Sequence, residues 1–277
     1  MHLIFTQWIT IAQLDNSVKE ITYLASITRP SLVFHNKIVI ILKSVFEEIT
    51  LSLQSISKKW KLAMKSRSNK FWMFDFDGTL VDSESAIRKC YVSVTSKLAP
   101  SQINRAQTIL IGPTLDESSR EILGDSHLPL LDEFKQKFQC EYDSNTVFET
   151  LTYPQADRVI KFLHGRGDKM AIATNKRSGP TKALLKYYKW ESFFEFVACI
   201  DQFASDKTKS DMVSRMLQQY PLFKKSFFVG DTLTDGYAAK NNKLNFVKAK
   251  YGYGDRQNWD DIPVYKSIDE IVELMLI

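Results

Sequence analysis

The chain has 277 residues, a formal net charge of +5 at pH 7 and 44% apolar residues. This length suits one domain with an insertion or two modest domains, and the apolar content predicts a globular, soluble protein. Its three cysteines are widely spaced without a CxxC pair, which excludes a disulfide framework and a zinc site and favours a cytoplasmic location. The four histidines form no metal-binding cluster.

The sequence predicts neither a membrane-spanning segment nor a nucleic-acid partner. It begins MHLIFTQWIT, without the positively charged start and small-residue cleavage site of a secretory signal. Its most apolar patch, residues 38–42, is far shorter than the roughly 20 residues that a transmembrane helix needs. Six basic residues between positions 58 and 70 follow one another without an acid, which favours a solvated linker over a surface for nucleic acid or anionic lipid.

Residues 1–69 are predicted to form a helical extension. Apolar residues recur at three- and four-residue steps between positions 38 and 60, which gives one apolar stripe along a helix. Pro30 should divide the region into a helix over residues 11–25 and a longer one over 35–65. The apolar stripe must pack against another surface. Three possibilities stay open: the rest of the chain, a second copy in a homodimer, or a partner or lipid surface.

From position 71 onward, apolar strands alternate with amphipathic helices, which is typical of a parallel α/β sheet. A last short strand is expected near Val264, after strands at residues 71–76, 169–174, 194–200, 226–230 and 245–249. The sequence therefore predicts a Rossmann-like core made of residues 70–83 and 155–277.

Residues 84–154, between the first two strands, are helical throughout and far longer than a single crossover requires. About four helices are expected, with periodic apolar positions in residues 86–98, 101–111, 115–123 and 128–142. We interpret this stretch as an α-helical cap inserted in the core.

The stretch FWMFDFDGTLVDS, residues 71–83, is the most informative in the chain. A buried strand ends on Asp75 and steps over Phe76 to Asp77, so the alternation of side chains along a strand brings both carboxylates to one side. Gly78 then permits a tight turn, and Thr79 offers a hydroxyl beside the acids. Such a pair would repel without a cation, and its hard oxygen ligands suit Mg²⁺.

A second pair of acids occurs in SFFVGDTLTDGYAAK, where a strand runs into Gly230, Asp231 and, four residues later, Asp235. This spacing puts one carboxylate at the strand's tip and the other at the start of a helix, so both can face the same cation. A helix-capping role for Asp235 is the alternative.

These motifs resemble the first and last signatures of the haloacid-dehalogenase-like hydrolases, the family of aspartate-nucleophile phosphatases. DFDGTLVDS is similar to the family's DxDGT motif and GDTLTD to its GDxxxD motif. The resemblance covers residues 70–277, and a helical cap inserted just after the first motif is the family's commonest layout among small-molecule phosphatases. The stretch NFVKAKYGYG after the last motif is similar to the corresponding strand and loop of phosphoglycolate-phosphatase-like members.

Between these two motifs, the resemblance implies a phosphate-binding hydroxyl and a lysine. Thr174 ends the second strand and is followed by Asn175 and Lys176, so Thr174 and Asn175 are candidate phosphate ligands. The motif lysine is Lys207 or Lys209, and Lys209 is favoured because it lies at the predicted start of the next helix. Ser210 departs from the Gly or Pro that often follows this lysine in the family.

The resemblance implies a Mg²⁺-dependent phosphatase that hydrolyses a small-metabolite phosphomonoester, phosphoglycolate-like or a sugar phosphate. Asp75 would be the nucleophile that forms a phospho-aspartate, with Lys209 cancelling charge on the phosphate. Asp77 would protonate the leaving oxygen and later accept a proton from water. The metal would lie among Asp75, Asp231, Asp235 and the backbone carbonyl of Asp77.

The cap is expected to decide the substrate. Gly112 and Pro113, in Ile-Gly-Pro-Thr, resemble a substrate loop of phosphoglycolate phosphatases, although Gly-Pro is also an ordinary turn between helices. Two rival interpretations stay open: a phosphomutase of the same superfamily, and a protein that binds a partner through its N-terminal helices.

Overall fold

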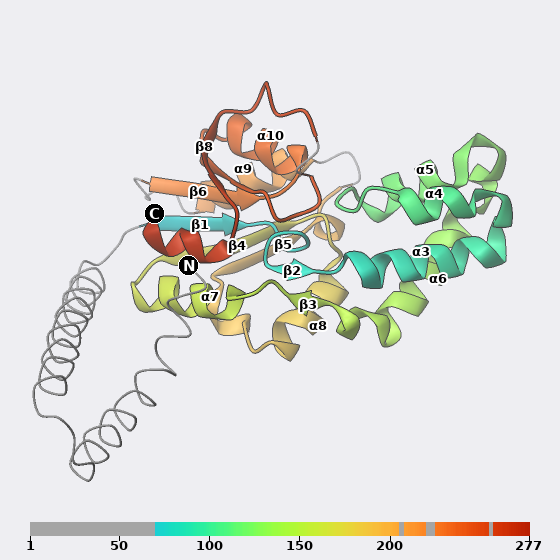
Figure 1. The fold of residues 1–277 in the computed structure, drawn as a ribbon, viewed down its shortest axis with the longest axis horizontal. Helices are drawn as coiled ribbons and strands as arrows, with labels where there is room; N and C mark the ends of the chain where they lie inside the picture. The colour runs from blue at the N-terminus through green and yellow to red at the C-terminus, as the bar shows by residue number, and fades with distance from the viewer. Residues whose placement is uncertain (1–69, 205–207, 220–224, 255–256) are drawn as a thin grey trace, which may run out of the picture. The chain divides into compact units, whose positions relative to one another are not determined.

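The computed structural model describes residues 70–204, 208–219, 225–254 and 257–277 (Figure 1). These residues belong to one compact unit, Ala63–Ile277. The predicted helical extension over residues 1–69 and the candidate Lys207 lie outside the described residues.

A six-stranded sheet in the order β5-β4-β1-β6-β7-β8 forms the core, and its neighbouring strands pair in parallel. The strands are β1 (Lys70–Phe74), β4 (Lys169–Thr174), β5 (Phe196–Cys199), β6 (Lys225–Gly230), β7 (Asn245–Ala249) and β8 (Val264–Ile268). The sheet confirms the predicted α/β fold class. β1 ends two residues earlier than predicted, because the backbone at Phe76 and Gly78 enters a turn closed by hydrogen bonds with Val81.

The side chains of β1 alternate between two apolar layers, one on each face of the sheet. Trp72 and Phe74 pack into the cluster that contains helix α7 (Ala156–Gly165), helix α8 (Ser178–Tyr187) and the 3-10 helix η6 (Ile271–Leu276). Phe71 and Met73 pack into the cluster of α9 (Lys209–Gln219) and α10 (Leu233–Asn241). Figure 1 shows α9 and α10 on the opposite side of the sheet from α7. Burial on both faces explains why β1 is a continuous apolar run.

Four α-helices form a bundle beyond the carboxyl end of β1 (Figure 1). They are α3 (Glu84–Leu98), α4 (Ile103–Thr108), α5 (Leu115–His127) and α6 (Leu131–Ser144). Short 3-10 helices join them: η1 (Pro100–Gln102), η2 (Leu128–Leu130) and, after α6, η3 (Thr146–Glu149). Aromatic side chains of α3 and α6 form the bundle's core, where Tyr91 contacts Phe134 and Phe138.

A two-stranded antiparallel sheet, β2 (Val81–Asp82) with β3 (Leu151–Thr152), joins the chain segments that enter and leave the bundle. The sequence analysis did not predict this pair. Two-residue strands carry no periodic pattern, and their pairing is visible only in three dimensions.

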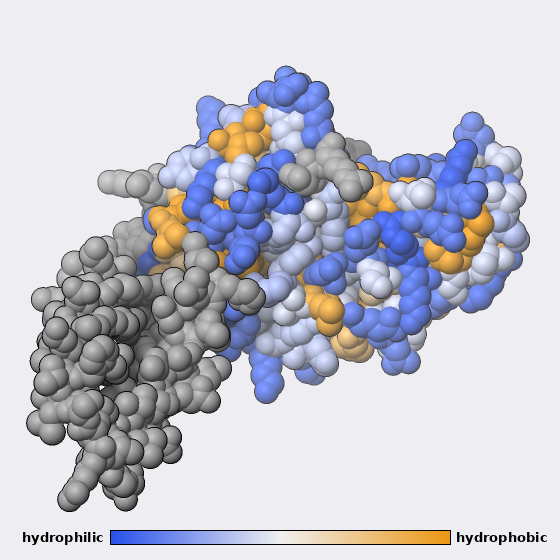
Figure 2. All heavy atoms as spheres, in the orientation of Figure 1, coloured by the Kyte–Doolittle hydropathy of each residue, from blue (hydrophilic) through white to orange (hydrophobic). Residues whose placement is uncertain are grey.

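The 3-10 helices η4 (Glu191–Phe193) and η5 (Ile200–Gln202) flank β5, which begins two residues later than predicted and ends one residue earlier because η5 begins at Ile200. Among the helices that the structure describes, none is both long and apolar enough to cross a membrane. On the face shown in Figure 2, hydrophobic residues form small separate patches among hydrophilic ones.

Candidate active site

Three buried carboxylates meet at the carboxyl ends of two neighbouring strands. Asp75 follows β1, Asp231 follows β6, and Asp235 lies in the first turn of α10. One oxygen from each lies within 4.8 Å of the others. Because β1 and β6 are parallel neighbours, their carboxyl ends open on the same edge of the sheet. The fold therefore brings Asp75 of the first motif together with both acids of the last motif.

Gly78 makes room for this cluster. Its φ of +79° is a left-handed conformation that favours glycine, and a Cβ atom at this position would lie 2.3 Å from Oδ2 of Asp231. The Asp231 carboxylate is fixed by the Thr79 hydroxyl, which donates to Oδ1 at 3.0 Å, and by the Tyr253 backbone N–H, which donates to Oδ2 at 2.8 Å. Gly78 and Thr79 of the first motif therefore help to position Asp231 of the last motif.

Lys209 is the first residue of α9, as predicted, and its buried side chain joins two of the acids. Nζ lies 3.0 Å from Asp75 Oδ2 and 2.6 Å from Asp235 Oδ1. Burial by itself would lower the pKa of Lys209, but the charges of Asp235 and Asp75 raise it above its ordinary value. Lys209 is therefore a fixed positive charge beside the candidate nucleophile.

Asp235 caps α10, which was the alternative interpretation of this residue. Its Oδ2 accepts hydrogen bonds from the backbone N–H groups of Asp231 and Thr232 and from the Thr232 hydroxyl. Its other oxygen accepts from Lys209. Both oxygens are thus engaged by protein donors, while Asp235 still lies within the acid cluster.

Burial changes the acidity of the cluster. Burial first, and then the charge of Asp235, raise the pKa of Asp75 to about 7, against the opposing effect of Lys209. Burial and Asp235 also raise the pKa of Asp231 well above its ordinary value. The sequence analysis treated Asp75 as a carboxylate with an ordinary pKa near 4. The structure differs, because Asp75 is only 4% exposed and lies beside two other acids.

The donor set of the cluster fits a divalent metal ion. Three acidic side chains face one another. In the described part of the chain, Lys209 is the one basic side chain that forms ion pairs with them. Three acids and one lysine leave two negative charges to balance when all are ionised. Carboxylate oxygens are the ligands that Mg²⁺ prefers.

Asp77 lies near the cluster, but its side chain faces other partners. Ser83 Oγ donates to Asp77 Oδ1 at 2.6 Å, and Lys176 Nζ lies 3.0 Å from Oδ1 and 3.1 Å from Oδ2. The carboxylate of Asp77 is therefore not placed with the three metal-ligand candidates. Only its backbone carbonyl was expected at the metal.

Lys176 was not predicted as a site residue, because its sequence context indicated only a turn. The side chain is buried and also donates to the hydroxyl of Tyr142, on α6 of the cap, at 2.8 Å. Burial alone would lower the pKa of Lys176, but Asp77 and Tyr142 raise it. No local signal marks this residue, since Asp77 lies 99 positions away along the chain.

The candidate phosphate ligands follow β4. Thr174 is buried, and its hydroxyl accepts a hydrogen bond from the backbone N–H of Lys176 at 3.1 Å. The side-chain amide of Asn175 donates to the Gly112 carbonyl in the cap at 3.1 Å, so it joins the core to the predicted cap loop. Arg177 reaches the cap too, with an ion pair to Asp143 at 2.6 Å.

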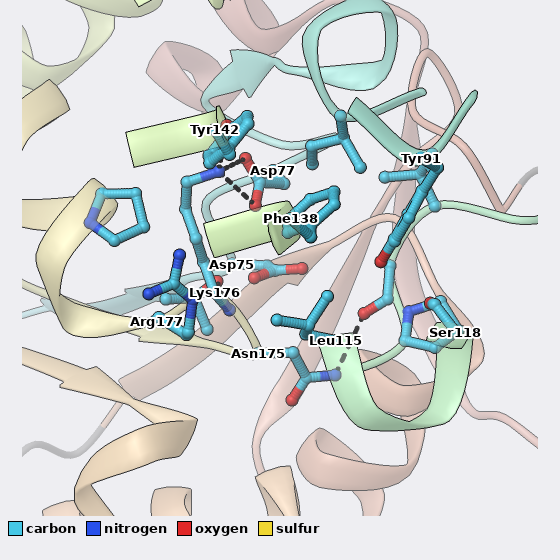
Figure 3. Close-up of a pocket in the computed structure, with 16 residues that line it drawn as sticks. Asp75, Asp77, Tyr91, Leu115, Ser118, Phe138, Tyr142, Asn175, Lys176 and Arg177 are labelled. Carbon is cyan, nitrogen blue, oxygen red and sulfur yellow. Dashed lines mark hydrogen bonds and ion pairs between the residues drawn. The ribbon is translucent and has the colours of Figure 1, made fainter. Parts of the chain in front are cut away.

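Core and cap enclose one cavity around these residues (Figure 3), with a volume of about 60 Å³. The core contributes Asp75, Asp77 and residues 174–177, and the cap contributes the predicted loop residues Gly112 and Pro113. A volume on this scale holds a few water-sized groups.

A parallel sheet with buried acids at its carboxyl edge, closed by a helical cap, defines an enzyme of the phosphatase class. The family model for haloacid dehalogenase-like hydrolases matches residues 72–249. The chain belongs to the haloacid dehalogenase-like hydrolases, as its motifs predicted.

Named relatives and a solved structure are similar to this chain. A phosphoglycolate phosphatase of Aquifex aeolicus is 26% identical over 185 residues, which cover 65% of this chain and 84% of that protein. The tyrosine-protein kinase PtkA of Mycobacterium tuberculosis is 26% identical over 212 residues, which cover 73% of this chain and 71% of that protein. A haloacid dehalogenase-like hydrolase from Streptococcus pneumoniae shares the fold, with a TM-score of 0.63, 21% identity, and coverage of 74% of this chain and 96% of that one.

Proposed function

We propose that this protein is a Mg²⁺-dependent phosphatase that hydrolyses a small-metabolite phosphomonoester through a phospho-aspartate on Asp75. The observation that carries the proposal is the position of Asp75, which lines the cap cavity while Lys209 lies 3.0 Å from its carboxylate. A nucleophile that lines a cavity between core and cap, beside a fixed cation, suits attack on a phosphate.

Three parts of the site would lower the repulsion between Asp75 and the phosphate dianion. Lys209 supplies one positive charge, and the hydroxyl of Thr174 and the backbone after β4 would hold phosphate oxygens. Mg²⁺, held by Asp75, Asp231, the backbone carbonyl of Asp77 and, directly or through water, Asp235, would supply charge neutralisation at the phosphate.

Asp77 is proposed as the acid and base. It lines the same cavity as Asp75, so it can reach the oxygen of a leaving group that lies on the cap side. It would give a proton to that oxygen in the first step and accept one from the attacking water in the second. Its present partners, Lys176 and Ser83, would orient the carboxylate.

Phosphate release tests this proposal. A panel of phosphoglycolate, pyrophosphate, sugar phosphates and phenyl phosphate would be incubated with the full chain in Mg²⁺ or in EDTA, beside Asp75→Asn. Release that needs Mg²⁺ and is lost in Asp75→Asn supports the proposal. Equal release by the variant would contradict the role of Asp75. Movement of the phosphate group from one position of a sugar phosphate to another, with a bisphosphate activator present and without phosphate release, would indicate a mutase.

A further inference from the structure

We propose that this site selects phosphomonoesters whose leaving group is an uncharged alcohol or phenol with an apolar carbon skeleton, and disfavours leaving groups that carry a second anion. The inference rests on the proposed function, and it narrows the substrate class. It follows from the residues that the cap places around the cavity.

The cap's share of the cavity is apolar, aromatic or hydroxyl-bearing, and none of it is charged. Its members come from α3, α5, α6 and the loop before α5: Ile87, Tyr91, Ile111, Gly112, Pro113, Leu115, Ser118, Phe138 and Tyr142. In Figure 3, Tyr91, Leu115 and Ser118 lie on the side of Asp75 away from Arg177. This is where the leaving group of a phosphate attacked by Asp75 would extend.

Both cations that line the cavity come from the core, and both already have acidic partners. Lys176 pairs with Asp77, and the Arg177 guanidinium lies 2.6 Å from Asp143. A second anionic group on the substrate would have to take one of these cations from its partner or stay without a cation in the cavity. Taking Lys176 from Asp77 is disfavoured, because it would leave a largely buried carboxylate without its cation.

The cap's own basic residues do not line the cavity. Each has a partner elsewhere on the bundle or its neighbour η3, and these residues are Arg88, Lys89, Lys97, Arg105, Arg120, Lys135 and Lys137. The described cap therefore offers no arginine or lysine to a carboxylate or a second phosphate.

Aromatic rings form a continuous wall instead. The ring centroids of Tyr91 and Phe138 are 4.5 Å apart, and those of Phe138 and Tyr142 are 5.6 Å apart. Carbon atoms of a leaving group that pack against such a wall are removed from water, which favours their binding. The hydroxyls of Tyr91, Ser118 and Tyr142 can hydrogen-bond uncharged oxygens of the same group.

Matched substrate pairs test the inference. One pair is phosphoglycolate and its amide, which differ by the negative charge of the leaving group, and the other is 4-carboxyphenyl phosphate and phenyl phosphate. We expect kcat/KM with the full chain and Mg²⁺ to be at least about tenfold higher for the neutral member of each pair, equivalent to about 1.4 kcal/mol. Higher kcat/KM for the anionic members would overturn the inference and leave the proposed function intact. No release from any of the four overturns the proposed function, and this inference with it.

A variant tests the assignment to the cap. Leu115→Arg places a cation in the cavity wall, and it should shift the amide-to-phosphoglycolate preference towards phosphoglycolate by at least about tenfold. Ser126→Arg adds the same charge to an exposed position of α5 outside the cavity, and it should leave the preference unchanged. An unchanged preference in a folded Leu115→Arg protein would contradict the assignment of selectivity to the cap. The comparison of substrate pairs with the wild-type protein stands even if this variant does not fold.

Discussion

Lys176 and Asp77 form a buried ion pair in which Nζ lies 3.0 and 3.1 Å from the two carboxylate oxygens. The same Nζ donates to Tyr142 of the cap at 2.8 Å. One lysine of the core therefore connects the candidate acid and base to the element that covers the cavity.

Lys176→Met should lower both stability and activity. It leaves the Asp77 carboxylate without its cation, and we expect a loss of about 3 kcal/mol in the free energy of unfolding, measured by denaturant titration. Tyr142→Phe removes only one hydroxyl partner of Lys176 and should cost about 1 kcal/mol.

The leaving group distinguishes positioning by Lys176 from a purely structural role. If Lys176 acts through Asp77, kcat/KM should fall at least about tenfold more for phenyl phosphate than for 4-nitrophenyl phosphate, whose leaving group needs little protonation. Equal losses for the two substrates would show that Lys176 only supports the fold.

Gly78→Ala should damage the acid cluster. The new Cβ would lie 2.3 Å from Asp231 Oδ2, and alanine disfavours the φ of +79°. We expect a loss of about 2 kcal/mol or more in stability, together with most of the phosphatase activity. Gly165→Ala is the matched control, because a Cβ at this exposed end of α7 meets nothing within 4 Å. It should be neutral or stabilise by up to about 1 kcal/mol, and a similar loss in both variants would refute the explanation.

Mg²⁺ should stabilise the folded protein. The ion would offset repulsion among Asp75, Asp231 and Asp235, and at 100 times its dissociation constant it should raise the free energy of unfolding by about 2.7 kcal/mol. Thermal unfolding in Mg²⁺ and in EDTA measures this. Asp231→Asn should abolish most of the difference, whereas Asp132→Asn, at a side chain that is 97% exposed, should keep it. A wild-type protein that unfolds at one temperature in both buffers would argue against the metal site.

Much of the core was predictable because its strands are buried runs between turn-forming residues. The bounds of β4 and β7 agree with the prediction, and the cap contains four α-helices as expected. The first and last motifs were also readable, since each keeps two acids within five residues. Local spacing is enough to place such pairs on a strand tip and a helix start.

Features that depend on distant partners were not predictable. Lys176 became part of the site only through Asp77 and Tyr142, which lie 99 and 34 positions away. The raised pKa of Asp75 depends on burial and on Asp235, and a sequence pattern reports neither. The lack of cap cations at the cavity likewise follows from how arginines and lysines pair in the folded bundle.

The most direct test is a search for the phosphoryl group on Asp75. The full chain would be mixed with a ³²P-labelled substrate from the release panel and Mg²⁺, quenched in acid within milliseconds, and digested for peptide mapping. The account predicts a hydroxylamine-sensitive label on the peptide that contains Asp75, and no label in Asp75→Asn. Two results would contradict the account. One is phosphate release by the wild type with the label on another residue, and the other is release by Asp75→Asn at the wild-type rate.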